Sequence, residues 1–219
     1  MSDISGLLYD LLKAFSETFL MCGIAIVFSI ILGVPLGLFI YITSKGLFWE
    51  NKTLNFIGGF LINIVRSTPF VILLVLLIPF TQKVVGSTIG PAAASVPLTV
   101  AAIAFYARLV EASFCEVDKG VIEAAIATGA TTFMIIKDVL LAEALPSLFR
   151  GLTVTAISLV GYSAMAGIVG GGGVGDLAIR FGYYRYQTNV MIITVISLIV
   201  LVQGLQAFGD LISKEADKR

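Results

Sequence analysis

The stretch EAAIATGATTFMIIKDVLLAEALP, residues 123–146, lies in the middle of a chain that is otherwise strongly apolar. Small residues and scattered polar groups interrupt it, so it is unsuited to cross a bilayer, which takes roughly 20 mostly apolar helical residues. The whole chain has 219 residues, 58% hydrophobic and 13% charged, with a mean hydropathy of +1.02. This composition lies far outside that of ordinary soluble domains and indicates a membrane protein.

The charge and residue counts exclude several classes of function. Fourteen basic residues balance 14 acidic ones, so nothing suggests the basic face of a nucleic-acid-binding protein, and no nucleic-acid partner is expected. The chain contains no histidine, which removes His-ligated haem and the commonest metal ligand. It also carries no Walker motif. We therefore expect no catalytic residues, no metal site and no cofactor bound by this chain.

Five segments are long and apolar enough to cross a hydrocarbon core of about 30 Å as helices. They run approximately over residues 19–42, 57–80, 92–110, 151–169 and 190–212. The sequence therefore predicts an all-α integral membrane protein of the plasma membrane, which is the inner membrane in a Gram-negative source. Five transmembrane helices place the two termini on opposite sides.

The distribution of Lys and Arg predicts the orientation. With the N-terminus outside, ten of the 14 basic residues fall on the inner side, as the positive-inside rule favours. Residues 1–14 then form an extracytoplasmic segment, residues 15–207 the transmembrane domain, and residues 208–219 the end of the last helix and a cytoplasmic tail. The segment 123–146 is predicted to be cytoplasmic.

The second apolar segment carries Arg66 within it, because the residues from Thr68 to its end are too few to cross alone. A guanidinium inside the membrane costs about 2.5–3.5 kcal/mol on insertion scales. Two interpretations stay open. Arg66 reaches the inner interface from a helix bent at Pro69, or it faces a water-filled path between subunits, with Glu111 of the third segment as a candidate partner.

Glycines in three places suggest close packing or turns. Gly33 and Gly37 in the first segment, and Gly161 in the fourth, suit helix faces that approach closely in lipid. The run GGGGVGDL at 170–177 matches a dinucleotide-binding fingerprint in spacing, but that motif requires a preceding strand. We interpret the run as a tight or flexible exit from the fourth span.

The cytoplasmic segment has the pattern of an amphipathic helix over residues 121–136. Ile122, Ile126, Phe133 and Ile136 form its apolar stripe, opposite a face of small residues. Such a helix lies on the inner membrane surface, or its small face fits a groove on another protein. We expect Pro146 to break the chain so that the fourth span can begin.

The spacing in this segment resembles the EAA loop of ABC importer permeases, here within about residues 115–146. The residues that match the motif are Glu123, Ala124, Ala125, Gly129, Val139 and Leu141. The resemblance implies coupling helices that dock on a separate ATPase, with Glu123, Ala124, Ala125 and Gly129 at the contact. Val139 replaces the usual Ile, and Ala142 the usual Pro.

The runs VRSTPFVILLVLLIPFTQ and LVGYSAMAGIVGGGGVGDLAIRFGYYRYQ are similar to those of methionine-uptake permeases within this family. The resemblance implies a homodimer, two cytosolic ATPase subunits that bind ATP and Mg, an extracytoplasmic methionine-binding lipoprotein, and surrounding membrane lipid. The cargo would be methionine, in L and D form, moved by alternating access. Candidate pathway or gate residues are Arg66, Ser67 and Thr68 in the second span, and Tyr162, Ser163 and Met165 in the fourth.

Three alternatives remain at this stage. The chain could be a permease for another amino acid or small polar solute. A secondary transporter driven by ions is a second alternative, although such proteins usually show internal repeats and intramembrane carboxylates. The third is a structural membrane anchor for an enzyme.

Overall fold

Helices make up all of the regular structure in residues 4–217, the part of the chain that the computed structural model describes. The α-helices are α1 (Ile4–Phe28), α2 (Val34–Ile42), α3 (Lys52–Ser67), α4 (Phe70–Leu76), α5 (Ile78–Val85), α6 (Pro91–Cys115), α7 (Lys119–Ala127), α8 (Thr132–Met134), α9 (Leu141–Ile168), α10 (Gly173–Leu177) and α11 (Thr188–Ala216). Widened π-helical turns, η1 (Ser29–Gly33), η2 (Ile135–Leu140) and η3 (Ala178–Tyr183), connect some of them without a break.

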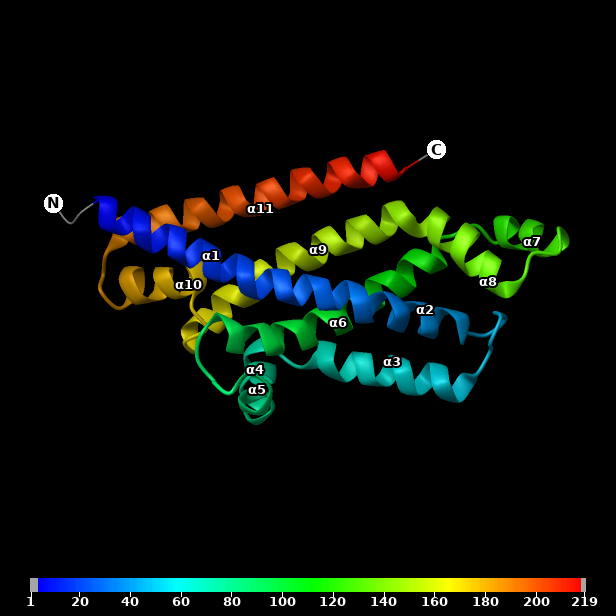
Figure 1. The fold of residues 1–219 in the computed structure, drawn as a ribbon, viewed down its shortest axis with the longest axis horizontal. Coiled ribbons are helices and arrows are strands. Elements are labelled where there is room, and N and C mark those ends of the chain that lie inside the picture. The colour runs from blue at the N-terminus through cyan, green and yellow to red at the C-terminus, as the bar shows by residue number, and fades with distance from the viewer. Residues whose placement is uncertain (1–3, 218–219) are drawn as a thin grey trace.

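The long helices run roughly along the long axis of the molecule (Figure 1). Four continuous helical stretches are long and apolar enough to cross a membrane: Gly6–Ile42, Pro91–Cys115, Thr132–Ile168 and Thr188–Ala216. They contain the whole of the predicted first, third and fifth spans. They also contain the predicted fourth span except its last residue, which lies one position beyond the end of α9. The N-terminal end of α1 lies at one end of the molecule and α7 at the other (Figure 1).

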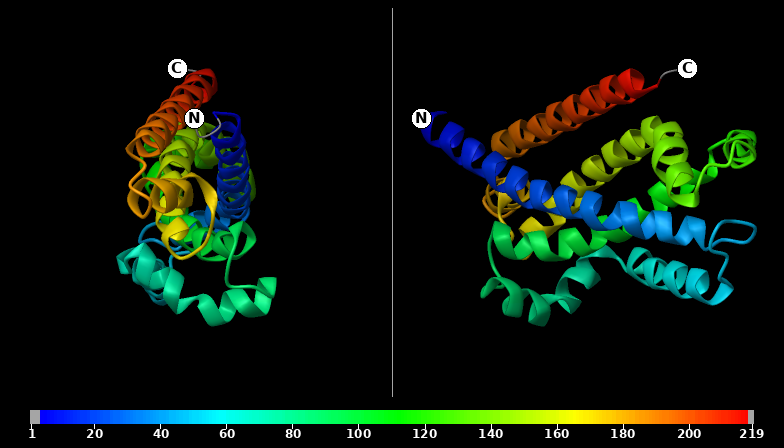
Figure 2. Two further views of the ribbon diagram at one scale, coloured as in Figure 1. Left: turned by 90° about the vertical axis from the view of Figure 1, so that its left-hand side faces the viewer. Right: turned by 45° about the vertical axis from the view of Figure 1, so that its right-hand side comes forward.

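The second predicted span consists of two helices, α3 and α4, and the chain bends at Pro69 as one of the two interpretations of Arg66 expected. The axes of α3 and α4 meet at 103° across a short break at Thr68 and Pro69. Thr68 is extended, with φ −82° and ψ 124°, because a residue that precedes proline is disfavoured in the helical conformation. Counted as one broken span, this pair raises the number of candidate spans to five. Figure 2 shows α4 and α5 turned away from the direction of α3.

Helix α6 lies at the centre of the packing, in contact with α1, α2, α3 and α9. Its buried side chains include Leu98, Ala107, Val110 and Phe114, all at 0% exposure. The approach of α2 to α6 depends on Gly37, since a Cβ there would lie 2.5 Å from the carbonyl oxygen of Ala107. The prediction that small residues of the first span form a packing face is confirmed at this position.

Replacing Gly37 with valine should therefore lower the stability of the fold. Overpacking of a close contact typically costs about 1–3 kcal/mol, so we expect a lower midpoint of thermal unfolding in detergent. Gly23 in α1 is the matched control, because a Cβ there would meet no atom within 4 Å. Gly23→Ala should leave the midpoint unchanged or raise it, since alanine in a helix is favoured over glycine by roughly 0.5–1 kcal/mol. Equal midpoints for Gly37→Val and the unmodified chain would contradict the close α2–α6 contact.

The glycine run after α9 forms a tight turn, as predicted. Gly170, Gly172 and Gly173 have φ values of +85°, +76° and +85°, a region that glycine enters without steric cost. The turn is fixed to α1, because Gly173 N–H donates to Glu17 Oε2 at 2.8 Å. Val174 N–H likewise donates to Thr18 Oγ1 at 3.0 Å. These bonds join the start of α10 to the first span.

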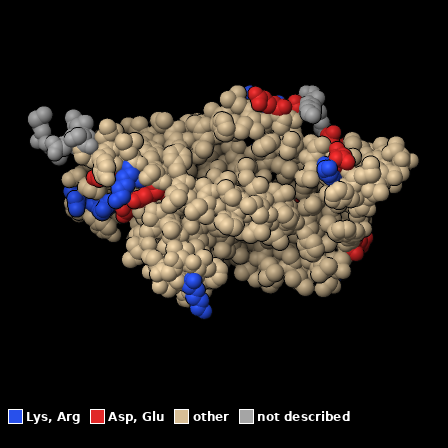
Figure 3. All heavy atoms as spheres, in the orientation of Figure 1, with Lys and Arg blue, Asp and Glu red and all other residues tan. Residues whose placement is uncertain are grey.

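Charged side chains on the face shown in Figure 3 lie near the left and right sides and at the upper and lower edges. Between them lies a broad band without Lys, Arg, Asp or Glu on this face. Large apolar side chains on α1, α3 and α11 are exposed in the single chain. Such an uncharged apolar band is what a bilayer, or a neighbouring membrane helix, covers.

Candidate functional site

A cavity opens where α3 breaks into α4. Helices α6 and α9 supply its other walls. The residues that line it are Val65, Arg66, Thr68, Phe70, Leu73, Ala101, Phe105 and Tyr162. The sequence prediction named Arg66, Thr68 and Tyr162 as pathway residues, and the fold brings these three to one cavity.

An aromatic pair forms one wall of this cavity. The rings of Phe70 and Tyr162 are stacked, with centroids 4.8 Å apart and planes 10° apart. Phe70 is buried and Tyr162 is half-buried. Thr68 Oγ1 donates to the carbonyl oxygen of Ile64 at 2.9 Å, which leaves the hydroxyl oxygen able to accept. The cavity thus combines one guanidinium, two hydroxyl groups and several apolar side chains.

The remaining predicted pathway residues lie elsewhere. Ser67 is exposed next to the helix break and is not among the lining residues. Ser163 is buried and donates to the carbonyl oxygen of Val160 at 2.7 Å. Met165 is 43% exposed and is likewise absent from the lining of the cavity. Their assignment to the pathway stays a prediction.

The predicted pairing of Arg66 with Glu111 is wrong. Glu111 Oε2 instead accepts from Arg108 Nη1 at 2.6 Å, one turn away on α6. Neighbours three residues apart on a helix lie on the same face, which is why Arg108 reaches Glu111 first. Among residues 4–217, none of the ion pairs involves Arg66.

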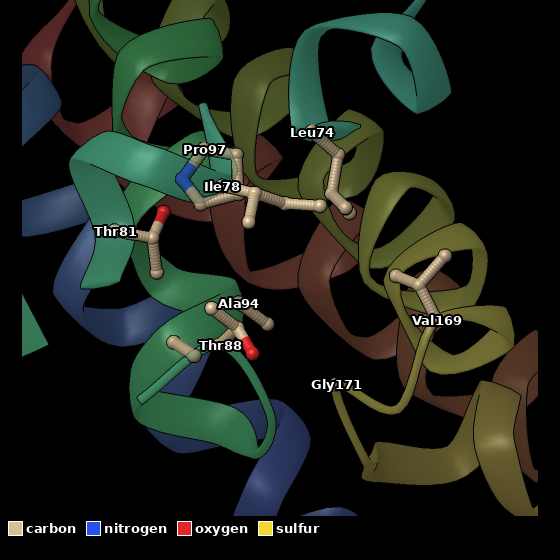
Figure 4. A pocket seen from close by; sticks show the side chains of 9 residues that line it. Leu74, Ile78, Thr81, Thr88, Ala94, Pro97, Val169 and Gly171 are labelled. Atoms are coloured by element: carbon tan, nitrogen blue, oxygen red, sulfur yellow. The ribbon is translucent and has the colours of Figure 1, made fainter. Parts of the chain in front are cut away.

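A second, smaller hollow lies between α5, the start of α6 and the glycine turn. Figure 4 shows Thr81 and Thr88 beside the apolar side chains of Leu74, Ile78 and Val169. No charged side chain lines it. This hollow therefore offers no group that would pair with an ionised substrate, and we assign it to packing beneath α5.

The cytoplasmic amphipathic helix predicted over residues 121–136 is shorter than expected. Helix α7 ends at Ala127, and Gly129 adopts φ +81°. Gly129 N–H donates to Ile126 O at 2.9 Å and Ala130 N–H to Ala125 O at 3.1 Å. This pattern is a Schellman motif, in which a left-handed glycine ends a helix. The chain then turns back into α8, so the predicted apolar stripe does not lie on one helix.

The turn between α7 and α8 exposes apolar side chains. Ile122 is buried against the core between α6 and η2, and Ala125 packs partly on the same core. In contrast, Ile126, Phe133 and Met134 are 54%, 73% and 50% exposed. We call these three residues the docking tip. Figure 1 shows α7 and α8 at the far end of the molecule from the N-terminus.

The four predicted coupling residues lie on α7 and at the turn that follows it. Glu123 and Ala124 are exposed on α7, whereas Ala125 faces inward and Gly129 sets the turn. The N-terminus of α7 is capped by Asp118, whose Oδ1 accepts from Gly120 N–H at 2.6 Å. A carboxylate at this position satisfies a helix N–H that has no partner within the helix. Local bonds therefore fix both ends of α7.

Pro146 does not break the chain, contrary to the prediction. It lies inside α9, which is continuous from Leu141 to Ile168. A proline removes the hydrogen bond to the carbonyl four residues earlier, which belongs to Ala142, an exposed residue. The turn that separates α7 from the fourth span lies at Gly129 instead.

A polar network near the same end was not predicted. Ser147 Oγ donates to Glu116 Oε2 at 2.7 Å. Arg150 Nε donates to Ser213 Oγ at 3.0 Å, and Ser213 Oγ donates to the carbonyl oxygen of Pro146 at 3.0 Å. These bonds join α6, α9 and α11. The partners lie 31 to 67 residues apart in sequence, so no local pattern could have indicated them.

Comparison with known proteins places this arrangement in a family. The family model described as binding-protein-dependent transport system inner membrane component matches residues 30–218. The probable D-methionine transport system permease protein MetI of Vibrio cholerae is 49% identical over 209 residues, 95% of this chain and 93% of the relative. The methionine import system permease protein MetP of Bacillus subtilis is 46% identical over 180 residues, 82% of this chain and 81% of the relative.

Solved structures agree with this placement. A chain of the MetNI methionine ABC transporter in an inward-facing conformation superposes with a TM-score of 0.96 at 42% identity, and all of both chains is covered. A chain of an amino acid ABC transporter crystallised with histidines has a TM-score of 0.78 at 20% identity, over 98% of this chain and 99% of the other. At that identity the second match shows the fold alone. The chain belongs to the family of binding-protein-dependent transport system inner membrane components.

Proposed function

We propose that this chain is the permease subunit of an ATP-driven importer that carries methionine across the plasma membrane. The observation that carries the proposal is the full-length match, at 42% identity, to the permease-like chain of a methionine ABC transporter. The relatives named for methionine or D-methionine transport support the same cargo. The cavity beside Arg66 combines a guanidinium with hydroxyl and apolar groups.

The proposed assembly contains two copies of this chain, two cytosolic ATPase subunits and an extracytoplasmic methionine-binding lipoprotein, surrounded by membrane lipid. ATP and Mg would be bound by the ATPase subunits, because the chain has no Walker motif of its own. In the proposed orientation, the N-terminus is outside and the docking tip and the C-terminus are cytoplasmic, as the charge distribution favours.

The proposed mechanism is alternating access. ATP binding closes the ATPase pair and moves α7 and α8. Helix α8 continues through η2 into α9. Because α9 carries Tyr162, its displacement changes the wall of the cavity beside Arg66. Rigid-body movement of packed helices is a common way in which a site opens to alternate sides. Glu123, Ala124 and Gly129 would act at the ATPase contact.

Uptake into proteoliposomes tests this proposal against a secondary transporter. The vesicles would contain the permease and the ATPase encoded beside it, with the binding protein added outside and ATP enclosed. We expect labelled methionine to accumulate with ATP and to show no accumulation with a proton or sodium gradient alone. Accumulation that follows an ion gradient in the absence of ATP would support the secondary transporter instead.

A further inference from the structure

Arg66 lies near the C-terminal end of α3, and its side chain is exposed in the single chain. It is 14 residues after Lys52, the first residue of α3, and at about 1.5 Å per residue this places it about 21 Å along the helix. A hydrocarbon core is about 30 Å thick. None of the ion pairs within residues 4–217 neutralises this guanidinium. An ionisable side chain at such a depth generally faces water or protein and serves a function.

The backbone next to Arg66 is irregular at the same depth. The extended conformation of Thr68 and the 103° bend interrupt the helical hydrogen bonds between α3 and α4. Lipid offers no replacement for such bonds, so irregular backbone inside a membrane occurs where it lines a cavity or is covered by protein. The break and the guanidinium thus independently indicate a polar space at this place, and the structure has its cavity there.

The lining of the cavity suits a particular kind of molecule. Arg66 is the sole charged residue among the lining residues, which include no carboxylate. A guanidinium recognises a carboxylate through two parallel N–H···O bonds. The stacked rings of Phe70 and Tyr162 offer an aromatic surface, which thioether sulfur contacts favourably.

We propose that this cavity is a substrate-binding subsite, in which the Arg66 guanidinium holds the α-carboxylate of an amino acid. The thioether side chain lies along the Phe70–Tyr162 pair. Recognition depends on the carboxylate rather than on the α-ammonium group, because no acidic side chain lines the cavity. The inference rests on the proposed function for the identity of the cargo, and it adds where and through which groups the cargo binds.

Equilibrium binding to the permease–ATPase complex in nanodiscs, without the binding protein, tests the subsite. Labelled methionine is titrated, and methionine amide, which lacks the carboxylate, serves as competitor. We expect the amide to bind at least tenfold more weakly than methionine. Arg66→Gln should weaken methionine binding at least tenfold and abolish the preference for methionine over the amide. Arg66→Lys should give an intermediate affinity, because lysine keeps the charge but lacks the paired N–H donors of the guanidinium.

Arg185→Gln is the matched control, since it removes the same charge from a residue on the exposed loop before α11. It should bind methionine as the unmodified complex does. Two further variants test the aromatic wall and remain informative if Arg66 variants do not assemble. Tyr162→Ala, which removes the ring, should weaken binding at least fivefold, and Tyr162→Phe, which keeps the ring, should bind more tightly than Tyr162→Ala.

The outcomes separate this inference from the proposed function. Unchanged methionine affinity in Arg66→Gln, or equal affinity of the unmodified complex for methionine and its amide, would overturn the subsite. Equal affinities for Tyr162→Phe and Tyr162→Ala would overturn the aromatic wall. Methionine uptake without measurable binding at millimolar methionine would overturn the subsite and leave the function standing. Absence of both uptake and binding would overturn the function itself.

Discussion

Replacing Gly129 with valine is expected to reduce ATP-driven uptake at least tenfold. Gly129 has φ +81°, and a left-handed conformation costs an ordinary L-residue about 1–2 kcal/mol, with β-branched residues the least tolerant. A Cβ at this position would meet no atom within 4 Å, so crowding contributes nothing. The cost comes from the backbone alone. The variant should shift the turn between α7 and α8 and displace the docking tip.

Gly129→Asn is the matched control, because asparagine tolerates the left-handed conformation and also ends helices at this position. We expect it to retain most of the uptake. Co-purification of the ATPase and uptake into proteoliposomes are the two measurements. If Gly129→Val assembles and transports like the unmodified chain, the assignment of this turn to ATPase coupling is wrong.

Truncating Phe133 to alanine should separate the permease from its ATPase. Phe133 is 73% exposed at the docking tip. Large aromatic side chains at the centre of an interface contribute about 2–4 kcal/mol or more on truncation. We therefore expect at least a thirtyfold weaker association, measured by titrating the labelled ATPase onto permease in nanodiscs.

Phe208 on α11 offers a matched control, because it is 64% exposed and lies on a membrane-spanning helix instead. Phe208→Ala removes the same side chain from a surface of similar exposure and should leave association with the ATPase within twofold. If both variants bind the ATPase equally well, the docking tip is not the contact surface. If Phe208→Ala alone weakens association, the contact lies along α11.

The spans were predictable because they depend on local composition. Length and hydropathy identify a membrane helix without knowledge of its neighbours, and the four continuous spans contain the expected segments. The break near Pro69 was also indicated, because proline restricts the residue before it. Its angle was not predictable, since the direction of α4 depends on how Phe70 packs against Tyr162, 92 residues later in the chain.

Two predictions, at Gly129 and at Pro146, are wrong for different physical reasons. The helical pattern of residues 121–136 predicts one continuous helix, and a proline at residue 146 predicts a break. In the structure, a left-handed glycine with two capping hydrogen bonds ends α7. The single hydrogen bond lost to Pro146 falls at an exposed turn of a helix that its neighbours support. A local cap thus ends α7 at Gly129, whereas α9 continues through Pro146.

The cavity could be predicted only in part. Arg66 was recognisable as costly inside a membrane, and the small and polar residues of the fourth span suggested Tyr162. Phe70 was not identified, because a phenylalanine in an apolar segment gives no sign of its partner. The ion pair between Arg108 and Glu111 follows from their spacing on one helix, and Arg108 is the nearer partner for Glu111 than Arg66.

ATP hydrolysis by the reconstituted assembly tests whether this chain couples the methionine-binding lipoprotein to the ATPase. The permease, its ATPase and the methionine-binding lipoprotein are combined in nanodiscs, and the rate is measured with and without methionine. We expect a severalfold increase in the rate of ATP hydrolysis that requires permease, binding protein and methionine together. Phe133→Ala should abolish this increase. A rate that methionine and the binding protein leave unchanged would contradict this coupling.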